Sequence, residues 1–212
     1  MECAYAPYNW SQPSADGGAV KIAGSNEYAY GYDVMIAKKL ADSMGADLEI
    51  HKIEWDGLAP AVVSGKIDAA IAGMSITSKR KESVDFTKPY YYATVVALVK
   101  KDSPQAQAKS VADLKGSVAT SQLNTIWYDQ IDQVPDVKKL PAIDNVPGMI
   151  VALKSGKCNL IVTDIPTAKA AAFANPDLTM VTFPEVKASK LLKKMLKSAL
   201  LLKKATRNWQ TL

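Results

Sequence analysis

The chain has 212 residues, of which 48% are apolar and 22% charged, a composition typical of a globular protein with one domain or two small ones. Its formal net charge of +5 is uneven, because residues 1–186 carry 18 basic and 21 acidic side chains whereas residues 187–212 carry 8 basic and no acidic ones. The main body therefore does not indicate a nucleic-acid partner, no run of 18 apolar residues predicts a transmembrane helix, and two cysteines with one histidine exclude a disulfide framework and a zinc site.

Helical and strand patterns alternate along the first half of the chain. Residues 31–45 have apolar side chains at helical spacing, with Asp33 as the expected N-cap and Gly45 as the residue that ends the helix. A second helix is predicted over residues 58–64. Strands are predicted over residues 48–53, 68–74 and 90–99.

The second half repeats this alternation, which favours an α/β fold with a mostly parallel sheet. The predicted helices span residues 110–114, 125–134, 147–155 and 166–174. The predicted strands span residues 118–121, 137–143, 160–164 and 178–183.

Two segments of the sequence are similar to each other. Residues 64–73 and 155–164 each begin with Ser-Gly-Lys at a predicted helix end and continue into an apolar strand that ends in a small or polar residue. Open α/β sheets bind ligands at the carboxyl ends of their strands. The repeat therefore predicts two similar lobes, each with a strand end that can contact a ligand.

Five motifs in series carry a resemblance to a known family. They are AYAPY at residues 4–8, GYDV at 31–34, WDGLAP at 55–60, AGMSITSKR at 72–80 and VDFTKPYY at 84–91. This series resembles extracytoplasmic solute-binding proteins of bacterial family 3, the capture subunits of ABC importers for polar amino acids. The resemblance covers about residues 1–186 and implies the two-lobed α/β type II periplasmic-binding fold, with a ligand cleft between lobe one (residues 1–93) and lobe two (residues 94–186).

The resemblance assigns ligand-binding roles to side chains in lobe one. Arg80 matches the residue that clamps the α-carboxylate, a role that suits the bidentate guanidinium, and Ser75 matches a donor to the same group. The carbonyl of Gly73 is expected to receive the α-ammonium. Tyr5 and Trp55 match an aromatic pair that holds the ligand side chain between them.

Lobe two supplies the remaining matches. Thr125 and Ile126 correspond to carboxylate donors at a helix N-terminus, and Asp164 corresponds to the carboxylate that receives the ammonium group. The side-chain end of the pocket is expected to be lined by Glu2, Ala72 and Gln122.

Structural alternatives exist for several of these residues. Arg80 precedes a Lys-Glu pair and could belong to a solvated surface. Asp164 could simply cap the following helix, and Tyr5 and Trp55 could be core aromatics.

The sequence predicts a binding protein for a polar L-amino acid rather than an enzyme. Glu2 with the Tyr5/Trp55 pair favours arginine or lysine, whereas Ala72-Gly73 resembles the glutamine-binding branch and leaves glutamine or histidine second. The resemblance implies a monomer outside the cytoplasm, free or lipid-anchored, that delivers its ligand to a membrane permease without a cofactor or metal; no leader is visible. The alternatives are a cyclohexadienyl-dehydratase-like enzyme on the same fold and a ligand-sensing domain.

Residues 187–212 depart from the family pattern. Residues 190–204 are rich in Leu and Lys and could form a cationic amphipathic helix that binds membranes. Alternatively, a one-nucleotide shift of codons that encode residues 194–210 reads EDVKISVAVKKGNTELA, which is the returning strand and helix start that the family requires. Under this hypothesis the basic tail is a frameshift product, and lobe one lacks a strand, its closing helices and the second crossing between lobes.

Overall fold

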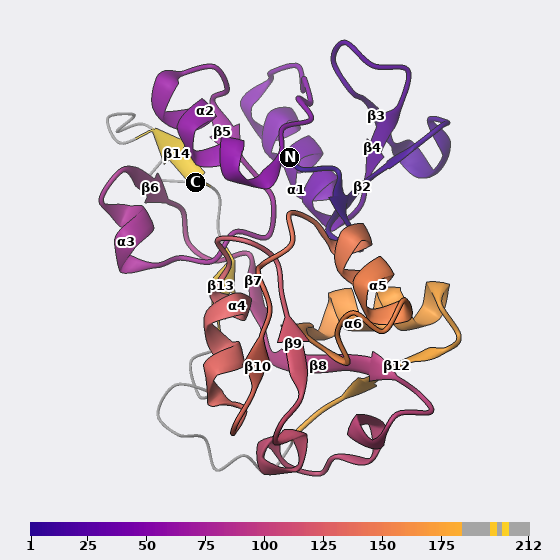
Figure 1. Ribbon diagram of the computed structural model, residues 1–212. Coiled ribbons are helices and arrows are strands. Elements are labelled where there is room, and N and C mark those ends of the chain that lie inside the picture. The colour runs from indigo at the N-terminus through magenta and orange to yellow at the C-terminus, as the bar shows by residue number, and fades with distance from the viewer. Residues whose placement is uncertain (184–195, 199–200, 204–212) are drawn as a thin grey trace. The chain divides into compact units, whose positions relative to one another are not determined.

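The computed structural model describes residues 1–183, 196–198 and 201–203 (Figure 1). The chain divides into two compact units, unit 1 (Met1–Tyr92 and Lys197–Leu212) and unit 2 (Ala93–Leu196). Strands β7 (Tyr91–Ala93) and β13 (Leu196–Ser198) pair with each other and contain the residues at which the chain passes from one unit to the other.

Unit 1 begins with a small antiparallel sheet. Its strand order is β1-β2-β4-β3, and every pairing in it is antiparallel. The strands are β1 (Ala4–Tyr5), β2 (Asn9–Gln12), β3 (Val20–Lys21) and β4 (Tyr28–Tyr30). The ring of Trp10 on β2 packs edge-on against Tyr30 on β4, with 5.1 Å between centroids, a cross-strand pair that stabilises this register.

Helix α1 (Tyr32–Met44) follows β4 directly and ends as predicted. Gly45 adopts the left-handed conformation (φ +62°) that terminates a helix without a Cβ penalty. The predicted N-cap is wrong, however, because the capping position is Gly31 and not Asp33. Gly31 has φ +126°, and a Cβ there would lie 2.4 Å from the Tyr8 carbonyl oxygen, so this tight entry requires glycine and carries Asp33 into the protein interior.

The rest of unit 1 alternates short helices with short strands. The elements are η2 (Trp55–Gly57), α2 (Leu58–Ser64), β5 (Ala69–Ala70), α3 (Ser78–Lys81) and β6 (Val84–Phe86). The predicted strand at residues 48–53 reduces to a single parallel bridge between Ile50 and Ile22. Its partner segment turns away at once, since Ser25 N–H donates to the Ile22 carbonyl.

The end of the chain contributes to unit 1 as a strand. Strand β14 (Leu201–Lys203) lies between β5 and β6 and is antiparallel to both, with Leu201 opposite Ala70 on one side and Phe86 on the other. The expectation of a helix is therefore wrong at residues 196–198 and 201–203, and this strand position is filled rather than missing. The other residues of the predicted helix, 190–195, 199–200 and 204, lie outside the described part of the chain.

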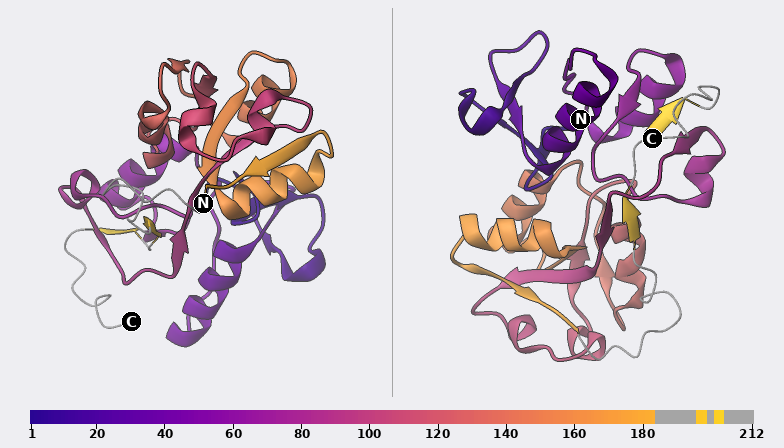
Figure 2. Two further views of the ribbon diagram at one scale, coloured as in Figure 1. Left: turned by 90° about the horizontal axis from the view of Figure 1, so that it is seen from below. Right: turned by 180° about the vertical axis from the view of Figure 1, so that it is seen from behind.

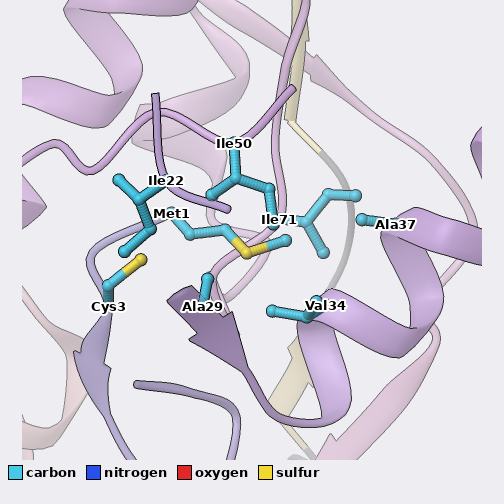
Figure 3. Close-up of a cluster of buried hydrophobic side chains, with 8 residues drawn as sticks. All are labelled: Met1, Cys3, Ile22, Ala29, Val34, Ala37, Ile50 and Ile71. Atoms are coloured by element: carbon cyan, nitrogen blue, oxygen red, sulfur yellow. The ribbon is translucent and has the colours of Figure 1, made fainter. Parts of the chain in front are cut away.

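Two apolar clusters form the core of unit 1. One joins β4 and α1 to the N-terminal residues and the β5 region, and Figure 3 shows its side chains converging from these elements. Its buried members are Met1, Cys3, Ile22, Ala29, Val34, Ala37, Ile50 and Ile71. The second cluster lies around α2 and contains Trp55, Leu58, Val62, Ala70, Ala72, Met74 and Val84.

Unit 2 is built on a five-stranded mixed sheet of order β10-β9-β11-β8-β12. Strands β10, β9 and β11 are parallel, and β8 pairs antiparallel with both β11 and β12, so β12 runs in the same direction as β11. Four of the five strands of this sheet therefore share one direction, as the predicted mostly parallel sheet requires, and β8 is the reversed strand. The strands are β8 (Val95–Lys100), β9 (Val118–Thr120), β10 (Lys138–Lys139), β11 (Leu160–Asp164) and β12 (Leu178–Val181). Strand β10 is shorter than predicted because Pro141 has no N–H with which to extend the ladder.

The helices of unit 2 pack on this sheet, and Figure 2 shows α6 running along β8 and β12. They are α4 (Ile126–Gln130), α5 (Val146–Lys154) and α6 (Ile165–Ala174), with 3-10 turns η3 (Pro104–Gln107), η4 (Val111–Leu114) and η5 (Ile131–Gln133). Side chains cap three of these helices: Asn145 Oδ1 accepts from Gly148 N–H at 2.9 Å, Asp164 caps α6, and Ser110 forms a capping box with Asp113.

The two similar sequence segments adopt the same local structure. Gly65 after α2 and Gly156 after α5 both have φ +79°. The following lysines, Lys66 and Lys157, donate their N–H groups back to the helices at 2.9 and 3.0 Å. Each turn leads into a strand, β5 in unit 1 and β11 in unit 2. Among the described helices, none is long and apolar enough to cross a bilayer.

Candidate functional site

The predicted ligand-binding residues fall into two groups, one in each unit, and each group has its own geometry. In unit 1, Gly73 follows β5 and has φ +62°. A Cβ at this position would lie 2.9 Å from Cε1 of Tyr5, whose ring stacks on Tyr8 with 4.8 Å between centroids. Both the left-handed backbone and the close aromatic ring therefore require glycine here.

Arg80, Trp55 and Ser75 also come together in unit 1. The Arg80 backbone N–H donates to Thr77 Oγ1 at the start of α3, and its guanidinium carbon lies 5.5 Å from the Trp55 ring centroid. Its Nη1 donates to the Ser75 carbonyl at 2.8 Å. Arg80 is thus half-buried and held in place, unlike a solvated surface side chain, and its planar fork can address a carboxylate.

The aromatic pair and the expected pocket-lining residues of unit 1 are buried. Tyr5 is 4% and Trp55 8% exposed, so both are core aromatics, yet each also contacts a predicted ligand residue. Ala72 is fully buried in the cluster around α2, and the Glu2 side chain is 2% exposed. A buried carboxylate such as Glu2 is costly and needs polar or cationic surroundings.

In unit 2 the loop after β9 joins Gln122 to Thr125. Thr125 Oγ1 donates to the Gln122 carbonyl at 2.7 Å, and Gln122 Nε2 donates to the Asp144 carbonyl at 3.0 Å. Thr125 is the N-cap of α4, and Ile126 is its first residue. Because α4 has only five residues, the expected contribution of a helix dipole is not supported, and only the individual backbone N–H groups remain as donors.

Asp164 ends β11 and is 1% exposed. Its Oδ1 accepts the Thr167 N–H at 2.8 Å, so it caps α6 as the structural alternative predicted. The cap occupies one oxygen of a group that has about four acceptor positions, so capping and ligand binding are compatible roles.

A buried polar network lies next to Gly73 that was not predicted from the sequence. Asp33 is fully buried and accepts hydrogen bonds from Asn9 Nδ2 and from the Tyr90 hydroxyl, both at 2.7 Å. Burial raises the pKa of Asp33 from 3.8 to about 6, although the hydrogen bonds from Tyr90 and Asn9 oppose this. Asp33 and Tyr90 both lie in family-like motifs, but the helical spacing around Asp33 favoured a cap instead.

A hollow of about 540 Å³ in unit 1 lies away from these residues, beside α1, and is lined by Ala37, Leu40, Met44, His51 and their neighbours. None of the predicted ligand residues lines it. Within the described residues there is also no cluster of three or more His, Cys, Asp or Glu side chains that could hold a metal.

Comparison with known proteins decides the family. The sequence pattern of the bacterial extracellular solute-binding proteins of family 3 matches residues 19–200. The chain belongs to this family. The match includes β5, the Gly73–Arg80 region and all of the unit 2 sheet.

Two relatives of this solute-binding protein have informative names. The chain is 32% identical over 174 residues to "Probable histidine-binding protein" of Campylobacter jejuni, which covers 82% of this chain and 62% of that protein. It is 33% identical over 160 residues to "ABC transporter arginine-binding protein 1" of Escherichia coli K12, covering 75% of this chain and 64% of that protein. The chain therefore spans less than two thirds of the length of these relatives.

Solved structures support the fold. An amino acid ABC transporter substrate-binding protein from Streptococcus pneumoniae, bound to L-arginine, matches 97% of this chain and 80% of its own, with a TM-score of 0.81 and 26% identity. The fold of the solute-binding protein is thus the predicted two-lobed α/β periplasmic-binding fold.

Proposed function

We propose that this chain binds a polar L-amino acid, with arginine preferred, and delivers it to an ABC importer without converting it. The observation that carries the proposal is the arrangement of Arg80, which is held between the Trp55 ring and the Ser75 carbonyl while its N–H groups form a rigid fork. A side chain fixed in this way loses little conformational entropy when a carboxylate binds.

The two ends of a zwitterion have different partners in this proposal. Arg80 and Ser75 bind the α-carboxylate from unit 1, and the backbone N–H groups of Thr125 and Ile126 bind it from unit 2. The α-ammonium is received by the carbonyl of Gly73 and by the carboxylate of Asp164. Gly73 and Asp164 follow the two equivalent Gly-Lys turns, so each unit contributes the end of the same kind of strand.

The preference for arginine depends on the residues around the ligand side chain. Glu2 supplies a buried carboxylate, and Tyr5 and Trp55 supply aromatic faces that attract a cation. Ala72 and Gln122 complete this part of the site. The relative named for arginine and the arginine-bound structure from S. pneumoniae support arginine, and the relative named for histidine supports histidine as a second candidate. Our order is therefore arginine or lysine first, glutamine or histidine second.

The cellular context is part of the proposal. We place the protein outside the cytoplasm because its family consists of extracellular solute-binding proteins. We further propose that it is a monomer that docks on a membrane permease. We also retain the frameshift hypothesis for the basic tail. The shifted reading places Ala, Val and Lys at positions 201–203, where the chain itself has Leu, Leu and Lys, so both readings supply a short strand compatible with β14.

Calorimetric titration with the twenty amino acids, ornithine and prephenate tests the proposal. We expect saturable binding of one polar amino acid, strongest for arginine, with no turnover of prephenate. Arg80→Gln should abolish this binding, whereas Lys79→Gln on the exposed side of α3 should leave it unchanged. Binding of prephenate alone with release of product, or equal binding in both variants, would overturn the proposal.

A further inference from the structure

Asp33 ends a buried chain of hydrogen bonds that starts at a predicted ligand residue. The Gly73 N–H donates to the Tyr90 hydroxyl at 2.9 Å, and this hydroxyl donates to Asp33 Oδ1 at 2.7 Å. The direction is fixed, because a backbone N–H can only donate and an ionised carboxylate can only accept. The hydrogen of the Tyr90 hydroxyl must therefore point at Asp33.

Both ends of this series of hydrogen bonds are anchored within unit 1. The second carboxylate oxygen of Asp33 accepts from Asn9 Nδ2 at 2.7 Å, and Asn9 Oδ1 accepts the Cys3 N–H at 2.7 Å. Tyr90 is held at its backbone as well, since the Tyr32 hydroxyl donates to the Tyr90 carbonyl at 3.1 Å. The Tyr90 hydroxyl thus has little freedom to move away from Gly73.

We propose that Asp33 and Tyr90 are positioning residues for the amino acid: the ionised Asp33 carboxylate, acting through the Tyr90 hydroxyl, holds Gly73 in the left-handed conformation that aims its carbonyl at the ligand's ammonium group. This inference rests on the proposed amino-acid-binding function. In this proposal, neither Asp33 nor Tyr90 contacts the ligand. The physical basis of the proposal is that a glycine backbone can adopt many conformations. The hydrogen bond from the Gly73 N–H to Tyr90 limits this freedom and so keeps the Gly73 carbonyl pointing in one direction.

Protonation of Asp33 breaks this arrangement. A protonated carboxyl must itself donate one hydrogen, but its two oxygens face the donors Asn9 and Tyr90, so one buried donor loses its acceptor. Burial raises the pKa of Asp33 to about 6, although the Tyr90 and Asn9 hydrogen bonds and the charge of the Met1 ammonium group act to lower it. Ligand affinity should therefore fall as the pH drops through 6.

The group of titrating neighbours is small. The groups that act on Asp33 are the Tyr90 hydroxyl, the Asn9 amide, the Gly73 N–H and the Met1 ammonium, and burial lowers the pKa of that ammonium. His51 pairs with Glu49 at 2.7 Å on the surface of the same unit. The Met1 ammonium and the His51–Glu49 pair are present in both wild type and the Tyr90 variant, so the difference between the two proteins isolates the Asp33–Tyr90–Gly73 hydrogen bonds.

The test compares Tyr90→Phe with Tyr92→Phe, a control that removes a hydroxyl from a side chain that is 45% exposed. For wild type and Tyr92→Phe, we expect affinity for the amino acid found by calorimetry to fall about tenfold between pH 8 and pH 5, the effect of one lost buried hydrogen bond. Tyr90→Phe should already be about tenfold weaker at pH 8 and should show little further loss. Asp33→Asn has one acceptor and one donor group, like the protonated carboxyl, so it should bind about tenfold more weakly than wild type at pH 8 and show no further loss at pH 5.

A second readout does not depend on ligand. In the free protein, the amide proton shift of Gly73 measured by NMR should titrate with a midpoint near pH 6 in wild type and stay constant in Tyr90→Phe and Asp33→Asn. If no amino acid binds, the proposed function fails but this titration still decides the inference. A Gly73 amide that does not respond in wild type, or a Tyr90→Phe protein with the wild-type pH dependence, overturns it.

Discussion

Gly73 and Tyr5 are in such close contact that no side chain fits between them. A Cβ on Gly73 would lie 2.9 Å from the Tyr5 ring, and the residue has φ +62°, so two independent constraints meet at this position. Tyr5 cannot move away easily, because its other neighbour is the stacked ring of Tyr8. The contact fixes the loop in which the family-like motif AGMSITSKR begins.

Gly73→Ala should therefore destabilise the protein by about 2–4 kcal/mol, the sum of a left-handed alanine and an overpacked contact. Gly24→Ala is a matched control in the same unit, because Gly24 has φ +68° but no atom within 4 Å of its Cβ position. We expect this control to lose only about 1 kcal/mol, the backbone cost alone. Urea unfolding measures both, and equal losses would show that the Tyr5 contact has no energetic effect.

Asp33 makes stability depend on pH. Its pKa is about 6 in the folded protein and near 3.8 in an unfolded chain, so the folded state binds a proton more tightly. Stability contributed by the protonated form is fully present below pH 4 and is lost as the pH rises through 6, by about 3 kcal/mol at most. Ligand binding thus favours the ionised form of Asp33, whereas folding stability favours its protonated form.

The difference in the free energy of unfolding between wild type and Asp33→Asn measures this effect. We expect wild type to become less stable relative to Asp33→Asn as the pH rises from 4 to 7, with the main change between about pH 4 and 6, the interval between the unfolded and folded pKa values. Chemical denaturation at four or five pH values gives the curve. A difference that is constant over this range, or one that changes in the opposite direction, would contradict the assigned pKa shift.

Asp164→Asn separates the two roles of Asp164. Asparagine is as good an N-cap as aspartate, so its side-chain oxygen can still accept the Thr167 N–H, and stability should change by less than about 1 kcal/mol. Its missing charge should nevertheless weaken binding of an α-ammonium group by at least about tenfold. Asp164→Ala should lose both properties. Thermal unfolding and calorimetry distinguish these cases, and unchanged affinity in Asp164→Asn would leave Asp164 as a helix cap only.

Sequencing the gene tests the frame of the basic tail. The frameshift hypothesis predicts that codons 194–210, read one nucleotide earlier, encode EDVKISVAVKKGNTELA in the gene of origin. A protein that carries the shifted reading at residues 194–210 should then unfold at a higher temperature than the protein with the basic tail. An uninterrupted reading frame through these codons in independent isolates would rule the hypothesis out, and binding of the present chain to anionic vesicles, lost on deletion of residues 190–212, would favour the amphipathic tail.

Local signals in the sequence predicted the local structure well. The helix ends at Gly45 and Gly65 and the turn at Gly156 follow from the need for a left-handed residue, and the structure confirms all three. The Asp164 cap of α6, an alternative in the sequence analysis, is confirmed by its bond to the Thr167 N–H. The equivalent Asn145 cap of α5 was not predicted, although it follows from the same short-range chemistry.

Features that depend on distant residues were harder to predict. Asp33 bonds to Tyr90, 57 residues away, and no pattern near Asp33 distinguishes a buried network from a helix cap. The antiparallel pairings of β8 with β11 and β12, and the central position of β14, likewise depend on pairing between distant segments. The Leu-rich sequence at residues 201–203 fits a helix or a strand equally. These residues form a strand because β5 and β6 both offer backbone groups with which a strand can pair.

The most direct test of amino-acid recognition compares two ligands that differ only at the α-carboxylate. Calorimetric titration with L-arginine and with agmatine, its decarboxylated analogue, measures what Arg80 and Ser75 contribute. We predict saturable one-to-one binding of L-arginine and at least a hundredfold weaker binding of agmatine, because the guanidinium fork then has no carboxylate partner. Equal affinity for the two ligands would contradict the proposed role of Arg80.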